Sequence, residues 1–180
     1  MKAVVIYESV YGNTHTIATA IASGLSTELA VDVHPVGETP ADILQDVDLL
    51  VVGGPTHAHG MTRPSTRKAG IDAARDPEKG LEVDPAAGQG VREWLAGADT
   101  LGGWSAAFDT RAHGPAMLTG RASRGIAKLL QRGGCTMLTE PESFLVSKDN
   151  QLLPGEEERA EAWGRQLALQ LLGGSLASTS

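Results

Sequence analysis

A polar turn near the N-terminus carries the side chains of this chain best suited to binding an anion. Its residues, which follow a short apolar run, are Ser9, Val10, Tyr11, Gly12, Asn13 and Thr14. A helix is expected to begin there, so its backbone N–H groups and positive dipole end would face an anion. Because the turn has no Lys or Arg, dipoles and hydroxyls would hold a phosphate without a countercharge. The turn therefore predicts a phosphate-bearing cofactor; the alternative is a plain turn in which Asn13 or Thr14 caps the helix.

Two further loops follow apolar runs that are expected to be buried strands. The first contains two glycines and a proline, which together turn a chain sharply away from a sheet. Such a turn leaves backbone groups free to face the edge of a planar ligand. The candidate ligand-binding residues of the two loops are Pro55, Thr56, His57, Ala58, His59 and Gly60, followed by Asp109, Thr110, Arg111, His113 and Gly114.

Strand and helix patterns alternate along the chain, which predicts an α/β fold with a parallel sheet covered on both faces. Strands are expected at 3–7, 31–36, 49–53 and 104–108, with a fifth at 135–138 that 143–146 could extend. Helices are expected at 14–29, 41–45, 85–98, 121–131 and 156–172. The segment 61–84 has no clear period, which is typical of a lid or an interface; the alternative is an exposed excursion with one short helix. A ligand would lie at the carboxyl ends of the strands.

Length and charge restrict the class of protein. The 180 residues predict one domain, over 1–173, followed by a flexible tail at 174–180. The net charge of −7 argues against nucleic-acid binding. No apolar run is long enough to span a membrane and no secretory leader is visible, so no membrane insertion and a cytoplasmic location are expected.

Three other kinds of site were weighed against the ligand loops. A metal site could use His57, His59 and His113. Catalytic zinc, however, needs three protein ligands with supporting groups, and the loop that contains His57 and His59 has no Asp or Glu. A hydrolase elbow around Ser105 lacks its last glycine, and this serine falls inside an expected strand. A phospho-receiver domain needs an aspartate where this chain has Gly53. We therefore predict no metal and no catalytic side chain.

The three loops together resemble those of the flavodoxin-like family. The first turn matches the family's phosphate loop at Ser9, Tyr11, Gly12 and Thr14, and the second is similar to a loop of flavodoxin-like quinone reductases. The resemblance covers nearly the whole chain. It implies a three-layer sandwich with a five-stranded parallel sheet in the order 2-1-3-4-5, and it implies FMN as cofactor. The first turn would then hold the phosphate, and the other two loops would flank the ring.

The resemblance also implies a redox function. The chain would transfer electrons between a reduced donor and a small acceptor, such as a quinone, or a redox partner protein. An FMN-dependent oxidoreductase of the NAD(P)H:quinone type fits this description; the alternative is a pure electron carrier or flavin-binding module. The sequence leaves open whether the chain forms a homo-oligomer. The second and third loops lack Trp and Tyr, which weakens stacking on the ring. Arg111 is hypothesised to lie near the ring and raise its potential.

Overall fold

The computed structural model describes residues 1–40, 42–98 and 101–177. Within these residues seven strands join one sheet, whose parallel part has the order β2-β1-β3-β5-β6. The strands are β1 (Lys2–Tyr7), β2 (Ala30–Pro35), β3 (Leu49–His57), β4 (Gly60–Met61), β5 (Trp104–Ala112), β6 (Thr136–Met137) and β7 (Glu142–Val146). The predicted parallel sheet and its 2-1-3-4-5 order are confirmed, because β5 is the fourth predicted strand and β6 the fifth.

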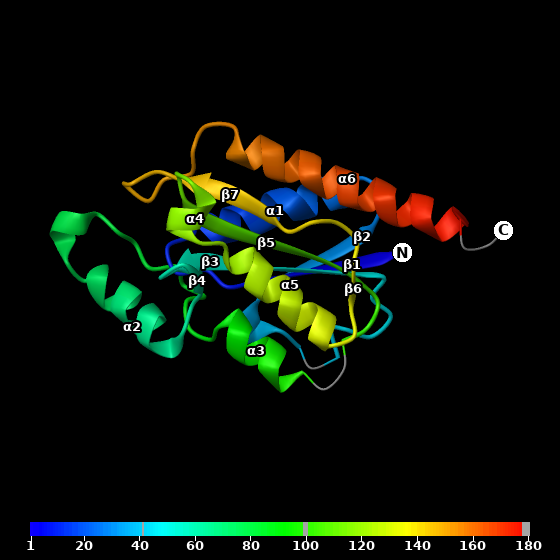
Figure 1. Cartoon of the computed structure of the whole chain (residues 1–180), viewed down its shortest axis with the longest axis horizontal. Coiled ribbons are helices and arrows are strands. Elements are labelled where there is room, and N and C mark those ends of the chain that lie inside the picture. Colours follow the sequence, from blue (N-terminus) through cyan, green and yellow to red (C-terminus); the bar gives the residue numbers. More distant parts are fainter. Residues whose placement is uncertain (41, 99–100, 178–180) are drawn as a thin grey trace.

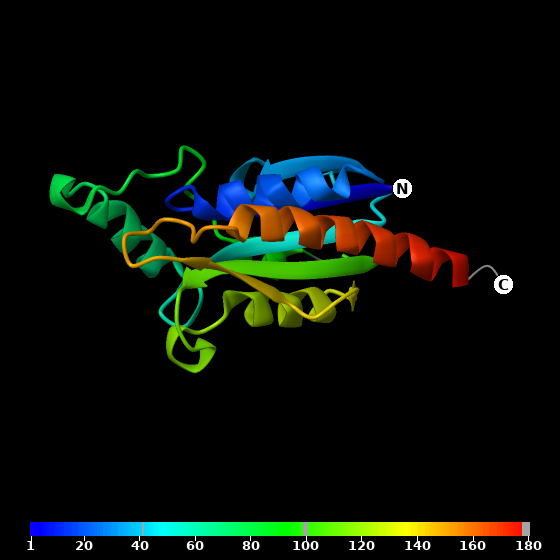
Figure 2. The same cartoon turned by 90° about the horizontal axis from the view of Figure 1, so that it is seen from above.

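Helices cover both faces of this sheet and give the expected three layers (Figure 1). They are α1 (Asn13–Leu25), α2 (Pro64–Ala73), α3 (Val91–Gly97), α4 (Ala116–Thr119), α5 (Ala122–Arg132) and α6 (Glu156–Ala177). Helices α1 and α6 pack together on one face, while α3 and α5 lie on the other. Helix α2 projects away from the layers at the carboxyl end of the strands (Figures 1 and 2). Among the described helices, none has the length and apolar character that crossing a bilayer requires.

Several predicted boundaries were wrong. Helix α1 ends four residues early, and α3 covers only the second half of 85–98, because the glycines at 88 and 90 disfavour a helix before it. Residues 42–46 form turns instead of a helix, and position 41 lies outside the described residues. Helix α6 continues past its predicted end to Ala177, while 178–180 lie outside the described residues. The long segment 61–84 contains α2 and a 3₁₀ turn at Pro77–Lys79. It therefore contains a short helix, as the alternative of an exposed excursion predicted.

The edge of the sheet beside β5 is built from two short strands. β6 pairs with the start of β5, and β7 pairs with its end, from Phe108 opposite Glu142 to Ala112 opposite Val146. Between them the chain leaves the edge at 138–141, where a proline removes a backbone donor. Because β7 runs parallel to β5, the segment that follows it emerges at the carboxyl edge of the sheet.

The core has one apolar cluster on each face of the sheet, as expected for parallel strands covered on both sides. Under α1 and α6, three aromatic rings meet edge to face with centroids 6.1 to 6.5 Å apart. They belong to Phe108, Phe144 and Trp163, all buried. Under α3 and α5 the cluster is aliphatic, with Ile6 and Leu130 among its fully buried side chains. The rigid sheet between these clusters fixes where its carboxyl edge presents side chains.

Two glycines let α1 and α6 approach closely. A Cβ at Gly164 would lie 2.2 Å from the backbone oxygen of Ile21, and one at Gly24 would lie 2.0 Å from that of Glu161. We expect Gly164→Ala to lower the free energy of unfolding by about 1–3 kcal/mol, because backbone must move. The matched control Gly173→Ala, in the same helix with open space around it, should instead add roughly 0.5–1 kcal/mol. Urea unfolding of both variants measures this; equal effects would contradict the close contact.

Candidate functional site

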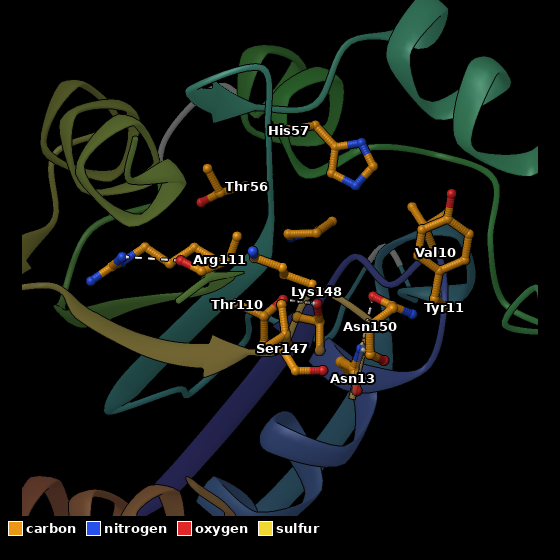
Figure 3. Close-up of a pocket in the computed structure, with 14 residues that line it drawn as sticks. Val10, Tyr11, Asn13, Thr56, His57, Thr110, Arg111, Ser147, Lys148 and Asn150 are labelled. Atoms are coloured by element: carbon orange, nitrogen blue, oxygen red, sulfur yellow. Dashed lines mark hydrogen bonds between the residues drawn. The ribbon is translucent and has the colours of Figure 1, made fainter. Parts of the chain in front are cut away.

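A cavity of about 240 Å³ opens at the carboxyl ends of β1, β3, β5 and β7 (Figure 3). It is formed by the start of α1, the ends of β3 and β5, and the loop after β7. The residues that line it are Val10, Tyr11, Asn13, Thr14, Pro55, Thr56, His57, Thr110, Arg111, Ala112, Val146, Ser147, Lys148 and Asn150. None of them is Asp or Glu, and two are cationic residues. This lining is chemically suited to a ligand that bears an anionic group.

The first predicted turn forms one end of this cavity. Gly12 adopts a left-handed φ of 88° directly before α1, and its N–H donates to the hydroxyl of Ser9 at 3.0 Å. Ser9 is buried and lies behind the lining. The Thr14 and Thr110 hydroxyls lie 2.7 Å apart and link the first turn to β5. These hydrogen bonds therefore fix the position of the start of α1 at the edge of the cavity.

The loop after β7 is part of the site, although none of its residues was predicted to be there from the sequence. Asn13 donates from its Nδ2 to the backbone oxygen of Asn150 at 2.9 Å and to its Oδ1 at 3.1 Å. The loop is closed by the Ser147 N–H, which donates to the Gln151 carbonyl at 2.7 Å. Lys148 reaches into the cavity from this loop (Figure 3). The signal was present in the sequence, since a polar segment that follows a parallel strand must emerge at the ligand edge.

An aromatic pair closes the side of the cavity toward α2. Tyr11 and His57 stack with ring centroids 6.5 Å apart and an interplanar angle of 28°. The Tyr11 hydroxyl donates to the Gly70 carbonyl at 2.8 Å, which ties the site to α2. Burial raises the pKa of Tyr11 and lowers the pKa of His57, so both groups favour their neutral forms. The aromatic side chain that the second and third loops lack comes from the first turn.

The Arg111 side chain is turned away from the cavity (Figure 3). Its Nη1 donates to the Gly114 carbonyl at 2.8 Å and to the Thr119 hydroxyl at 2.9 Å. These bonds hold the loop that contains α4. Its buried Nε has no partner among the described residues. The hypothesis that Arg111 supplies the charge beside a bound ring does not fit this orientation, and Lys148 is the cation that extends into the cavity.

Asp109 and Thr56 position α5. The Asp109 carboxylate is buried and accepts the Ser123 N–H at 2.7 Å, while the Thr56 hydroxyl accepts the Ala122 N–H at 2.9 Å. Burial raises the pKa of Asp109, and the bond from Ser123 opposes that rise. Thr56 also lines the cavity, whereas Asp109 lies behind it. The two side chains cap the first turn of α5 and so fix the ends of β3 and β5 relative to this helix.

The second and third predicted loops are largely strand, and only part of each reaches the cavity. Pro55 pairs with Thr110 in the β3–β5 register, because both strands run further than the sequence predicted. Ala58 and His59 take positive φ angles of 46° and 68° in the turn into β4. Together with Gly60 they line a second cavity beyond His57. His113 and Gly114 lie outside the lining of both cavities.

Two rival sites find no support in the geometry. Ser105 is fully buried in β5, where its hydroxyl faces the Thr136 carbonyl at 3.4 Å and the Met137 sulfur at 3.3 Å, so it is a core serine. Across the part of the chain that the structure describes, no three His, Cys, Asp or Glu side chains are grouped to hold a metal.

The sheet order, the three layers and a ligand cavity at the start of the first helix define the flavodoxin-like fold. Residues 4–67 match the family model described as a flavodoxin domain. This region contains the first turn and the end of β3, two of the three elements on which the sequence resemblance was based. The resemblance to the flavodoxin-like family is thereby confirmed.

Solved structures agree with this fold. A flavodoxin from the domain Archaea superposes with a TM-score of 0.64 at 21% identity, covering 95% of this chain and 99% of that chain. Flavodoxin 1 from Bacillus cereus superposes with a TM-score of 0.64 at 19% identity, covering 94% of this chain and 98% of that chain. A WrbA-like flavodoxin protein from Agrobacterium tumefaciens superposes with a TM-score of 0.58 at 21% identity, covering 96% of this chain and 98% of that chain. No curated protein matches this chain. The match to the flavodoxin domain model supports the expectation of FMN as cofactor, and the solved structures support the fold.

Proposed function

We propose that this protein binds FMN in the cavity at the start of α1 and transfers electrons between a reduced donor and an acceptor. The observation that carries the proposal is the lining itself. It combines a helix N-terminus, hydroxyl and amide groups and the Lys148 cation, with no acid among its residues. A phosphorylated ligand is the class that such a lining favours. The flavodoxin domain match covers the same turn.

Each part of the lining has a separate task in this proposal. The start of α1, with Asn13 and Thr14, would hold the phosphate. Pro55 and the Tyr11–His57 pair would limit the space for the ring and exclude water from one side of it. FMN itself supplies the redox chemistry, since its ring accepts one or two electrons. Lys148 would place a positive charge in the cavity and so favour the form of the ligand with more negative charge.

The electron donor and acceptor define two versions of this function. An oxidoreductase of the NAD(P)H:quinone type would accept a small substrate beside the ring, and a second cavity next to His57 favours this version. A pure electron carrier would need only an exposed edge for a redox partner. The exposed side chains of Met117 and Leu118, 93% and 68% accessible on α4, offer a contact surface of that kind.

The test is a titration of the purified protein with FMN and, in parallel, with riboflavin, followed by visible absorption and fluorescence. FMN should bind at least tenfold more tightly than riboflavin, because only FMN carries the phosphate. Stepwise reduction then separates the versions: two distinct one-electron steps indicate a carrier, and a single two-electron step indicates a reductase. Absence of flavin binding, or equal affinity for both flavins, would overturn the proposal.

A further inference from the structure

A second cavity, of about 400 Å³, lies on the other side of His57 from the first. His57 lines both cavities, so a ligand in the second would share a wall with a ligand in the first. The side chains that line the second cavity and can contact a polar ligand are His57, His59, Arg63, Ser65, Thr66 and Arg92. It is formed where the β3–β4 turn, the start of α2 and α3 meet, so the long segment 61–84, which the sequence predicted to be a lid, an interface or an exposed excursion, contributes to its lining.

The charge of this cavity is opposite to that of the whole chain. The chain has a net charge of −7, yet the lining contains two arginines and two histidines and neither Asp nor Glu. Arg63 is exposed and forms no ion pair within the described ranges. The positive end of α2, a ten-residue helix, opens on the same cavity through Ser65 and Thr66. His57 favours its neutral form because burial lowers its pKa, so the two guanidinium groups and the start of α2 are the features that favour a negative charge in this cavity.

Two hydrogen bonds to backbone carbonyls in and just after β4 hold the Arg92 side chain in place. Its Nε donates to the Thr62 carbonyl at 3.0 Å, and its Nη2 donates to the Met61 carbonyl at 3.1 Å. These two bonds leave its Nη1 side available for a ligand. The guanidinium is therefore oriented before any ligand arrives, which lowers the entropy lost on binding.

A buried polar network around the Thr62 hydroxyl holds the same stretch of backbone. The Glu8 carboxylate accepts the Thr62 hydroxyl at 2.5 Å and the Val91 N–H at 3.0 Å. Arg67 donates to the Thr62 hydroxyl at 2.9 Å and pairs with Glu93 at 2.7 Å. The network links α2 and α3, two of the elements that form the cavity, to the residue that follows β1, and so fixes these two walls relative to the sheet.

We propose that this second cavity binds the oxyanion of a small redox substrate, a phosphate or a carboxylate group, and holds the substrate against His57 beside the first cavity. The role as a substrate site rests on the proposed function, whereas anion binding by the cavity does not. Arg63 and Arg92 would bind the oxygens, since the N–H donors of a guanidinium can pair with two oxygens of either group, whether it is a planar carboxylate or a tetrahedral phosphate. The start of α2 would add its dipole.

The test is isothermal titration of flavin-loaded protein at low ionic strength with pyrophosphate and succinate, neither of which can reduce the flavin. Loading with flavin keeps the phosphate probes out of the first cavity. We expect saturable binding that Arg63→Gln weakens at least tenfold. The control Arg124→Gln removes the same charge from an exposed position on α5 and should change the affinity less than twofold. Ser65→Asp favours the start of α2 electrostatically, so it preserves the fold while repelling the anion, and it should weaken binding as much as Arg63→Gln.

The outcomes separate this site from the flavin site. Tighter binding of pyrophosphate than of succinate would assign a phosphate substrate, and the reverse would assign a carboxylate. No saturable binding of any probe to flavin-loaded protein, or equal losses in Arg63→Gln and Arg124→Gln, would overturn the anion site and leave the proposed function standing. If the protein takes up no flavin, the same titrations on Asn13→Asp protein, whose first cavity repels anions, decide the second site alone.

Discussion

Replacement of Asn13 by aspartate should weaken FMN binding roughly thirtyfold or more and change riboflavin binding only a few fold. Asn13 lies in the first turn of α1 and lines the cavity. Two unit charges about 4 Å apart near a protein surface repel by ~4 kcal/mol. Half of that energy corresponds to a thirtyfold change in affinity. Riboflavin lacks the phosphate, so it would not meet this repulsion. Parallel flavin titrations of the variant measure both affinities.

A control separates the new charge from the lost hydrogen bonds. Asn13 also donates to Asn150, and a carboxylate at the same position has no N–H with which to make these bonds. The variant Asn13→Ala loses the same bonds without adding charge, so it should weaken FMN and riboflavin by similar, smaller factors. Fold stability should change little in the aspartate variant, because a carboxylate is favourable in the first turn of a helix. Equal losses for both flavins in Asn13→Asp would show that the phosphate lies elsewhere.

Replacement of Phe108 by alanine should lower the free energy of unfolding by about 3–5 kcal/mol. Phe108 is fully buried, and its ring meets those of Phe144 and Trp163. It also packs onto the backbone of Gly53, where a Cβ would lie 2.1 Å from the ring. The variant would leave a cavity between the sheet and the helices α1 and α6, in a packed layer that can close around it only in part. Urea unfolding of the flavin-free protein measures the loss.

The matched control for Phe108→Ala is Leu169→Ala on α6. Leu169 is 61% exposed, so its truncation should change stability by no more than about 0.5 kcal/mol. A loss below about 1 kcal/mol for Phe108→Ala would show that the aromatic cluster is not packed as described. Because β5 also carries Thr110 to the cavity, a variant that still folds should bind FMN more weakly than the Leu169 control.

Local patterns in the sequence determined the architecture and the first turn. Apolar runs of strand length, separated by helical periods, predicted a parallel sheet, which the structure confirms; its strand order was implied by the family resemblance and is also confirmed. Gly12 supplied a second local feature, since its left-handed φ of 88° is a conformation that glycine adopts freely. The expectation of a phosphate site at the start of α1 follows from the same turn and stays a prediction. All of these features depend on residues that are neighbours in the chain.

Only the tertiary structure decided which side chains surround the cavity. Asn13 and Asn150 meet across 137 positions of sequence, and that contact places Lys148 at the site. Arg111 looked like a ligand-facing cation in the sequence, yet carbonyl groups of its own loop turn it away. The second cavity depends on Arg63 and Arg92, which the folding of 61–91 brings together. Side-chain direction and long-range pairing come from packing and from satisfying buried polar groups, which local periodicity does not encode.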